Sequence, residues 1–507
     1  MTRIVVLTSA VVIALTVVIA AGIAPTLAAD STTLVVAQGV GPTTLNPLVG
    51  ETIPLVNHYR QVFDALTVYD DKLKLQPALA TSWRLVNDTT WEFKLREGVK
   101  FHNGEPFTAQ AVKFTWDRVL DPAQKSTKKP RLPHLVSVEV VNDTTVRMIT
   151  AQPFPLLPGA LSSLFIVPPG YTKEKGDVYA GANPVGTGPF KFVRWVKDEQ
   201  VEFEANPQYW GGAPKIRRLV MKSIPETATR VAALQTHEVD LITNLPPHLQ
   251  EPIKNTAGLT VMTTPVLVNM IIELDTTNNG PVADKRVRQA LNYAIDKQAI
   301  IQQTLQGLGR PAKGQVVPPQ AFGHVARLAD YPHDPAMARR LLAEAGYPNG
   351  FPLTIATGDG RYLLDKEVAQ VVTGQLNQVG VKATLNVFEW GVYLQHLAKR
   401  TLGDGFLIGW YALPVPDAAQ ALAWFTSTNV YPYWKNEEFD KEVSQLAGTM
   451  AERTRLRAAQ KAIEIMREDA PVIFLYQAVA LYGANRAVSG LTVREDDLLN
   501  FTSVVKK

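Results

Sequence analysis

Aromatic and polar side chains follow three predicted strands directly. The strands are expected at 353–356, 382–388 and 406–410, and the side chains in question are Arg361, Tyr362, Trp390, Trp410 and Tyr411. In α/β sheets, ligands usually sit on the loops at the carboxyl ends of strands. A guanidinium offers a fork of donors to a carboxylate, and aromatic rings offer flat stacking walls. These five residues are therefore predicted to line a ligand pocket, with core packing as the alternative for the two tryptophans.

The sequence contains no recognisable catalytic motif. It has neither a Gly-x-Ser-x-Gly elbow nor a phosphate-binding Gly-x-x-x-x-Gly-Lys-Ser/Thr loop. His237-Glu238 lacks the second histidine of a metal-binding helix, and the 8 histidines show no ligand spacing. Asp70-Asp71 and Asp496-Asp497 are interpreted as turn and surface residues. No catalytic residue, metal ligand or cofactor is predicted.

Strand-like and helix-like segments alternate, which indicates an α/β protein. Helices are expected at 56–66, 284–306, 335–346, 363–378 and 453–468, and further strands at 33–37, 91–95 and 472–476. The helix at 284–306 has a regular apolar stripe, with Lys285, Arg286 and Arg288 on a solvated face. Asp334 is predicted to cap the helix that starts with Pro335.

The first residues have the layout of an export signal. Arg3 precedes an apolar run from Ile4 to Ile23, and Thr26 and Ala28 supply small residues for cleavage after Ala28. A signal peptide is therefore predicted at 1–28, with an uncleaved membrane anchor as the alternative because the run could span a bilayer. The mature protein is expected to be periplasmic.

The composition excludes several classes of protein. The chain has 507 residues and no cysteine, which excludes disulfide scaffolds, thiol catalysis and a lipoprotein anchor. A net charge of +4 is small for this length and argues against nucleic acid as a partner.

Eight sequence blocks occur in a fixed order between residues 33 and 483. They are Thr44–Pro47, Val62–Leu66, Pro77–Trp83, Leu95–Ala109, Pro184–Phe190, Asn206–Trp210, Arg286–Asp296 and Leu341–Tyr347. Together they resemble the family 5 extracellular solute-binding proteins, the peptide- and nickel-binding receptors of ABC importers.

The resemblance implies an α/β, two-lobed periplasmic binding protein fold (type II, cluster C) with an extra inserted subdomain and a hinge between the lobes. Lobe I would comprise residues 30–66, 184–275 and 484–507, the inserted subdomain 67–183, and lobe II 276–483. The chain crossings near 275 and 484 would form the hinge.

The resemblance also implies where the ligand binds. Leu45 and Asn46 would line one wall of the cleft, and Arg361 lies where some members bind a carboxylate. Peptide receptors of the family carry an aspartate a few residues after Gly409-Trp410, where this chain has Leu413, with Asp417 further along near a helix start. An ammonium buried against leucine without a partner would cost several kcal/mol. A non-standard peptide or amino-acid conjugate is therefore favoured over an ordinary peptide.

The predicted function is an exported receptor that captures a peptide-like or other mid-sized organic solute and delivers it, in the closed state, to a membrane permease. A monomer is expected. The alternatives are a nickel or metal-chelate receptor of the same family, an exported hydrolase, and a folding helper or structural protein.

Overall fold

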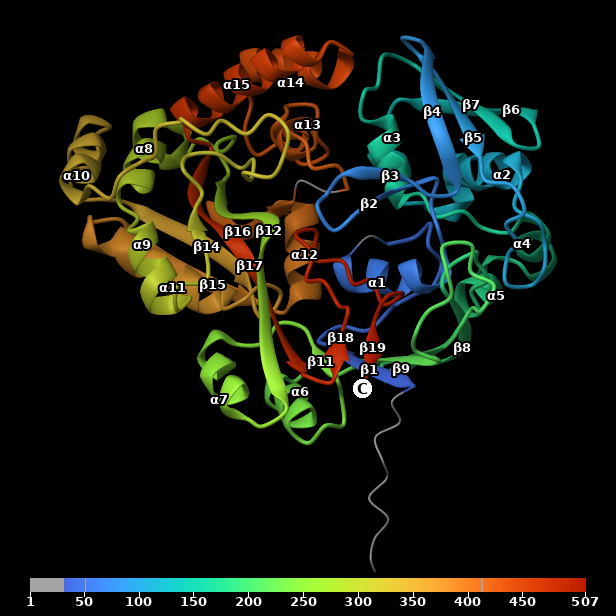
Figure 1. Cartoon of the computed structure of the whole chain (residues 1–507). Helices are drawn as coiled ribbons and strands as arrows, with labels where there is room; N and C mark the ends of the chain where they lie inside the picture. Colours follow the sequence, from blue (N-terminus) through green and yellow to red (C-terminus); the bar gives the residue numbers. More distant parts are fainter. Residues whose placement is uncertain (1–31, 51, 412–413) are drawn as a thin grey trace, which may run out of the picture.

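A computed structural model describes residues 32–50, 52–411 and 414–507 (Figure 1). The predicted signal peptide and Leu413 lie outside these residues. Within them, no helix is long and apolar enough to cross a membrane.

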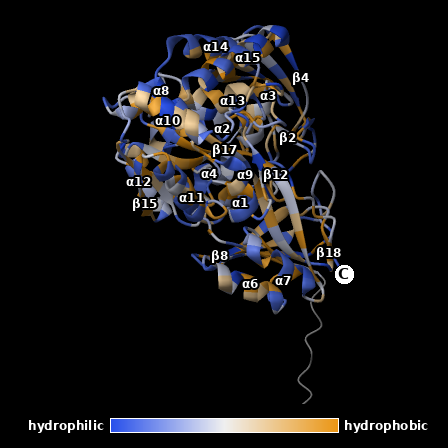
Figure 2. Cartoon of the chain, turned by 90° about the vertical axis from the view of Figure 1, so that its left-hand side faces the viewer, coloured by the Kyte–Doolittle hydropathy of each residue, from blue (hydrophilic) through white to orange (hydrophobic). Residues whose placement is uncertain are grey.

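One large mixed sheet runs through the molecule, and it has 11 strands in the order β15-β14-β16-β12-β17-β11-β1-β10-β9-β8, with β13 beside β17. The strands are β1 (Thr33–Gln38), β8 (Phe190–Val196), β9 (Gln200–Ala205), β10 (Arg218–Ser223), β11 (Leu241–Ile242), β12 (Leu259–Leu274), β13 (Arg310–Pro311), β14 (Pro352–Gly358), β15 (Lys382–Phe388), β16 (Gly405–Tyr411) and β17 (Val472–Asn485). Figure 2 shows hydrophobic residues along strands of this sheet and hydrophilic residues over outer helices.

The long strands β12 and β17 connect the two ends of the sheet. β1 and β8–β11 lie beyond one side of this pair and β14–β16 beyond the other (Figure 1). Every residue of β12 from Val266 to Leu274 is buried, as expected for a strand with partners on both sides. The pairing of β12 with β17 is irregular between Pro265 and Asn269. The division into lobes at the boundaries given above stays a prediction.

A separate 4-stranded sheet lies within the segment predicted to be an insertion. It contains β4 (Ala80–Asn87), β5 (Thr90–Leu95), β6 (Leu135–Asn142) and β7 (Thr145–Thr150), and α2 (Ala109–Leu120) packs against it. As predicted from the alternation, Trp91, Phe93 and Leu95 are all buried. They share one core cluster with the fully buried Trp116 of α2.

Helices cover the sheet at both ends, and most predicted helices are confirmed with shifted ends. They include α1 (Ile53–Val62), α6 (Thr227–Gln235), α8 (Lys285–Tyr293), α10 (Pro335–Glu344), α11 (Asp365–Gln378), α12 (Trp390–Lys399), α13 (Ala418–Leu422), α14 (Glu437–Gly448) and α15 (Glu452–Asp469). Asp334 caps α10 as predicted, because its side chain accepts a hydrogen bond from the Met337 N–H at 2.9 Å.

The prediction of one continuous helix over 284–306 is wrong. After α8, the chain forms only the short turns α9 (Lys297–Ala299) and a π-helical turn at Ile300–Thr304. Asp296 starts this second segment, since its side chain accepts from the Ala299 N–H at 2.8 Å. The Tyr293 carbonyl instead accepts a hydrogen bond from the Asp334 N–H at 2.8 Å. The apolar periodicity favours one helix, but this tertiary hydrogen bond at Tyr293 ends α8 there.

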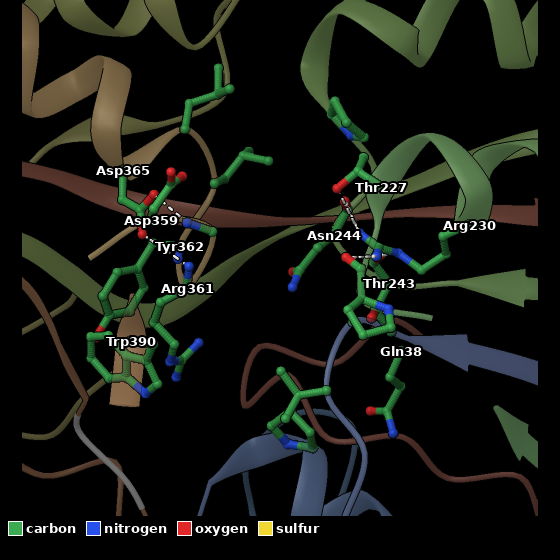
Figure 3. A pocket seen from close by; sticks show the side chains of 18 of the residues that line it. Gln38, Thr227, Arg230, Thr243, Asn244, Asp359, Arg361, Tyr362, Asp365 and Trp390 are labelled. Atoms are coloured by element: carbon green, nitrogen blue, oxygen red, sulfur yellow. Dashed lines mark hydrogen bonds between the residues drawn. The ribbon is translucent and has the colours of Figure 1, made fainter. Parts of the chain in front are cut away.

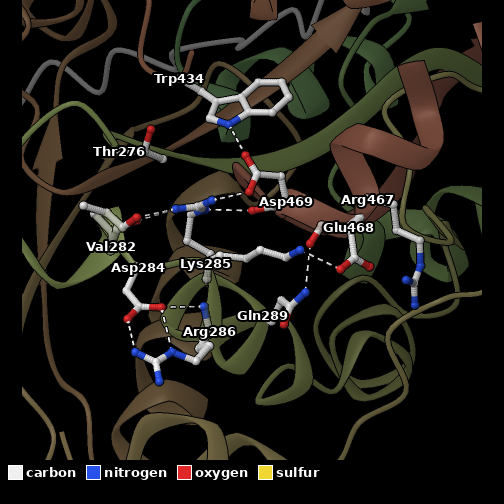
Figure 4. A network of polar contacts seen from close by, with 12 residues as sticks. Thr276, Val282, Asp284, Lys285, Arg286, Gln289, Trp434, Arg467, Glu468 and Asp469 are labelled. Atoms are coloured by element: carbon white, nitrogen blue, oxygen red, sulfur yellow. Dashed lines mark hydrogen bonds and ion pairs between the residues drawn. The ribbon is translucent and has the colours of Figure 1, made fainter. Parts of the chain in front are cut away.

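The interpretation of Arg288 as part of a solvated face is also wrong. Its side chain is 5% exposed, and its guanidinium donates to the carbonyls of Val282, Ala283 and Asp469 and to the Asp469 carboxylate. Figure 4 labels two of these partners, Val282 and Asp469. The Asp469 carboxylate also accepts from the Trp434 Nε1–H. Arg288 therefore joins the start of α8 to the end of α15.

Replacing Arg288 with methionine is expected to lower the free energy of unfolding by about 2–3 kcal/mol, because several buried acceptors lose a charged donor. Chemical denaturation monitored by tryptophan fluorescence measures the change. Lys285→Met is the control on the same helix, since it removes only the exposed ion pair with Glu468 and should cost less than about 1 kcal/mol. Equal effects of the two substitutions would contradict the assigned role.

Candidate functional site: an arginine-containing cavity between two walls

A cavity of about 300 Å³ lies where two distant parts of the sheet face one another. One wall comes from the loop 359–364 after β14 and from Trp390 at the start of α12. The opposite wall comes from the end of β1, the start of α6 and the segment after β11, and includes Gln38, Thr227, Arg230, Thr243 and Asn244 (Figure 3). The predicted residues Arg361, Tyr362 and Trp390 line this cavity together.

The loop that carries Arg361 is held by one buried carboxylate. The side chain of Asp365 accepts hydrogen bonds from the N–H groups of Gly360, Arg361 and Tyr362, each at 3.0 Å. Burial raises the pKa of Asp365, and these N–H donors counteract the rise. Leu364 has φ of 52°, a left-handed conformation that costs energy for a residue other than glycine. The loop therefore keeps a fixed shape because Asp365 binds it at several points.

Arg361 lies among aromatic rings. Its Cζ lies 4.6 Å from the Tyr362 ring centroid and 5.7 Å from that of Trp390. Its Nη2 donates to the Tyr411 hydroxyl at 2.9 Å, the one hydrogen bond of its guanidinium to the part of the chain that the structure describes. Burial alone would lower the pKa of Arg361, but Tyr411, Tyr362 and Asp497 raise it above its ordinary value. Arg361 is thus a charged fork with most of its donors available to a ligand.

Trp390 and Tyr362 form an aromatic wall beside this guanidinium. Their ring centroids are 5.9 Å apart in an edge-to-face arrangement, and Trp390 stacks on Tyr393 at 5.0 Å. Glu389 caps α12 by accepting from the Val392 N–H, which fixes the start of the helix and with it Trp390. The wall can pack against an apolar or planar part of a ligand.

The opposite wall is built around Arg230, a residue that was not predicted from the sequence to line the site. Its guanidinium is buried and donates to the carbonyls of Ile224, Pro225, Thr243 and Asn244 and to the Thr227 hydroxyl. It therefore ties together three segments of this wall and is already saturated with acceptors. No pattern in the sequence indicates that Arg230 contacts Thr243 and Asn244, since 13 residues separate Arg230 from Thr243.

The remaining predicted site residues lie elsewhere. Tyr411 touches the cavity only through Arg361, and Trp410 points to the other side, where its Nε1 donates to the Ala421 carbonyl. Leu45 is buried in a core cluster, and Asn46 lies beside a separate small pocket of about 20 Å³. The structure does not bring these two to the cavity.

The contacts of Asp417 stabilise the fold. It caps α13 by accepting from the Ala419 N–H at 2.8 Å, and it pairs with Arg455 at 2.6 Å. Its carboxylate is 5% exposed. Asp417 therefore lies at the start of a helix, as predicted from the sequence.

The interpretation of Asp496-Asp497 as a surface pair is wrong. Asp496 is buried and pairs with Arg494 at 2.6 Å, and Arg494 also reaches Asp71 and the Tyr69 carbonyl. Burial raises the pKa of Asp497 to about 6, and its neighbours include Tyr482 and Arg361. The C-terminal tail thus contributes one acidic group, Asp497, next to Arg361.

Three of the sequence blocks meet at one half-buried carboxylate. Asp64, from the block at 62–66, accepts from the Thr187 hydroxyl at 2.8 Å, the Tyr209 hydroxyl at 2.9 Å and Trp210 Nε1 at 2.8 Å. Gly186 has to be glycine, because a Cβ there would lie 2.1 Å from the Val62 carbonyl oxygen. These blocks therefore hold the framework together and do not line the cavity around Arg361.

Within residues 32–50, 52–411 and 414–507, no group of three His, Cys, Asp or Glu side chains is arranged to hold a metal ion.

Two lobes of α/β structure sharing long connecting strands, with a polar and aromatic cavity between distant segments, define a solute-binding protein fold. The model of the bacterial extracellular solute-binding proteins, family 5, matches residues 74–432, and the chain belongs to this family.

Individual relatives agree with this assignment. The chain is 30% identical over 483 residues to the glutathione-binding protein GsiB of Pectobacterium atrosepticum, covering 92% of this chain and 93% of the relative. The periplasmic binding protein DppA of Helicobacter pylori, solved with the peptide STSA, superposes with a TM-score of 0.84 at 26% identity, covering 94% of this chain and 98% of that one. NikZ of Campylobacter jejuni, solved with Ni(L-His), has the same fold, with a TM-score of 0.83, 24% identity, and coverage of 94% and 100%.

Proposed function

We propose that the mature chain is a periplasmic receptor of an ABC importer that binds a carboxylate-bearing, peptide-like solute in the cavity around Arg361. The observation that carries this proposal is Arg361 itself, a guanidinium enclosed by aromatic rings with a single hydrogen bond to the described residues. A carboxylate would accept two parallel hydrogen bonds from such a fork. The family membership supports the receptor role.

Binding would favour the closed form of the protein. The cavity has walls from both ends of the large sheet, so a ligand that fills it contacts both. A ligand shifts an open–closed equilibrium by its difference in affinity for the two states. We propose that lobe I, the inserted subdomain and lobe II are divided as expected above, with the hinge at the chain crossings near 275 and 484, at the ends of β12 and β17. The closed receptor, as a monomer, would then dock on the permease.

The ligand class follows from the charges available. Arg361 supplies a site for a carboxylate, whereas Leu413 stands where peptide receptors place an acid for the ammonium. We therefore propose a peptide-like conjugate or non-standard peptide. Relatives that bind glutathione or the peptide STSA fit such a range of ligands.

Native mass spectrometry of protein purified without denaturant tests this proposal, followed by thermal shift with a panel of carboxylate-bearing peptides and conjugates. A bound ligand at a hundredfold excess over Kd should stabilise the protein by about 2.7 kcal/mol. The same ligands with the carboxylate amidated should bind far more weakly. Equal binding of acids and amides, or saturable binding by none of the panel, would refute the proposal.

The shape of the loop around Arg361 should matter for binding, because the buried side chain of Asp365 holds that loop. Replacing Asp365 with alanine removes the acceptor for three loop N–H groups. The expected result is roughly a 10-fold weaker affinity, because Arg361 is no longer held in place. Hydrogen exchange should be faster at 360–362 and unchanged in the sheet β4–β7. Weaker binding without faster exchange at these residues would contradict this positioning role.

A further inference from the structure

A second arginine faces enclosed space near the cleft. Arg60 lies in the last turn of α1, whose residues Leu55, Tyr59 and Val62 are buried in the core. Its side chain lines two adjoining cavities of about 80 and 160 Å³, which also share Ser162 and Phe165. Pro414, which follows β16 on the far side of the large sheet, lines the smaller cavity. That cavity therefore lies, like the one around Arg361, between segments from both ends of the sheet.

The N–H groups of the Arg60 guanidinium have no hydrogen-bond acceptor among the described residues. No hydrogen bond, ion pair or ring contact joins its guanidinium to the residues of the chain that the structure describes; its interactions are longer-range ones with Asp64, Asp496, Arg494 and Tyr209. Burial and the charge of Arg494 lower the pKa of Arg60, so the site is costly for a cation. A guanidinium in such a place is ordinarily paired or hydrogen-bonded.

The neighbouring acids are already engaged by other donors. Asp64 accepts from Thr187, Tyr209 and Trp210, as described above. Asp496 accepts from Arg494 Nε at 2.8 Å and Nη2 at 2.6 Å. The described residues therefore provide carboxylates nearby but engage them with other donors, and they leave the guanidinium of Arg60 without an acceptor of its own.

The surroundings of Arg60 fit a carboxylate on a short apolar stem. The smaller cavity is lined by the apolar side chains of Ile53, Val56, Phe165 and Leu498. The cations Lys128 and Arg131 also face it, and so does Asp496, whose charge is paired with Arg494. Neighbouring residues of the C-terminal tail lie near the two arginines. The charge of Asp496 raises the pKa of Arg60, and the charge of Asp497 raises the pKa of Arg361.

We infer that Arg60 is a second anion-binding residue of the cleft, so that the transported solute carries two acidic groups, one for Arg361 and one for Arg60. This inference rests on the proposed function, since it assumes that a carboxylate binds to Arg361. It identifies the ligand class as peptide-like diacids, such as peptides with an acidic side chain.

Titration calorimetry with matched probes tests the inference. The probes are glutamyl and aspartyl di- and tripeptides, each compared with its two monoamides, and with simple peptides that have one carboxylate. Wild-type protein should bind at least one diacid at least 10-fold more tightly than either of its monoamides. Arg60→Gln should weaken the diacid at least 10-fold and leave one of the two monoamides unchanged. Arg457→Gln, on the exposed face of α15, is the control and should change nothing.

The outcomes separate the two proposals. Binding of single-carboxylate peptides through Arg361, with no gain for diacids and no effect of Arg60→Gln, would overturn the role of Arg60 and leave the proposed function intact. Absence of binding by every acid would overturn both. The melting temperature of ligand-free Arg60→Gln shows whether the variant is folded, and Arg60→Lys, which keeps the charge but not the fork, should bind the diacid with intermediate affinity.

Discussion

Replacing Arg361 with alanine is expected to weaken ligand binding by about 100-fold or more. The substitution removes the guanidinium that would pair with the carboxylate, and truncating one partner of a buried charge pair typically costs about 2–5 kcal/mol. It also removes the cation from the faces of Tyr362 and Trp390. The ligand carboxylate would then be enclosed without a partner. Titration calorimetry with the ligand that co-purifies with the wild-type protein measures the loss.

Two further variants separate the charge of Arg361 from its shape. Arg361→Lys keeps a positive charge but loses the planar fork, so it should recover only part of the affinity. Arg457→Ala should bind as the wild type does. The melting temperature of each ligand-free variant shows that it is folded. If Arg361→Ala bound the ligand with unchanged affinity while folded, the assignment of this cavity as the binding site would be wrong.

Replacing Glu273 with glutamine is expected to stabilise the protein by roughly 3 kcal/mol or more at pH 8.5 and to change little at pH 4. Glu273 lies on β12, is 3% exposed, and accepts a hydrogen bond from Trp424 Nε1 at 2.9 Å. Burial raises its pKa from 4.5 to about 8, and the charge of Asp275 adds to the rise. Glutamine keeps an acceptor for Trp424 and carries no charge.

The sign of the effect follows from proton binding. Between the unfolded pKa of 4.5 and the folded pKa of about 8, the folded state holds a proton that the unfolded state has lost. Stability therefore falls as the pH rises through this window, and the loss is complete above about pH 8. Denaturation curves at several pH values should show this fall in the wild type and its reduction in Glu273→Gln. Glu251→Gln, at an exposed ion pair, should keep the wild-type profile, and a parallel profile for Glu273→Gln would contradict the assigned pKa.

Local signals in the sequence were enough for most elements. The strand at 382–388 is found with the predicted ends, and Asp334 caps its helix, because both depend on residues close together in the chain. The helix predicted over 284–306 failed for the opposite reason. Its apolar stripe is buried, but the Asp334 N–H, far along the chain, occupies the Tyr293 carbonyl where the helix would continue.

The candidate site divides in the same way. Arg361, Tyr362 and Trp390 could be predicted because they follow strands of one parallel set, β14 and β15, whose carboxyl ends lie side by side. The same rule could not decide which of Trp410 and Tyr411 faces the cavity. Consecutive residues of a strand point to opposite faces, and the rule does not say which face the ligand meets. Arg60, Arg230 and Asp497 had no local signal. Arg60 and Arg230 line their cavities only because helices α1 and α6 fold against the cleft. Asp497 acts on Arg361 only because the C-terminal tail returns to it.

The sequence by itself determined the family and the framework. Its eight blocks identify a solute-binding protein, and three of them hold that framework through Asp64. The Thr187 and Tyr209 hydroxyls and the Trp210 indole all donate to this one carboxylate. Only the tertiary structure decided which charges face the ligand. Whether an arginine is saturated, as Arg230 is, or has open donors, as Arg361 and Arg60 have, depends on acceptors that distant segments bring to it, and sequence spacing does not encode that count.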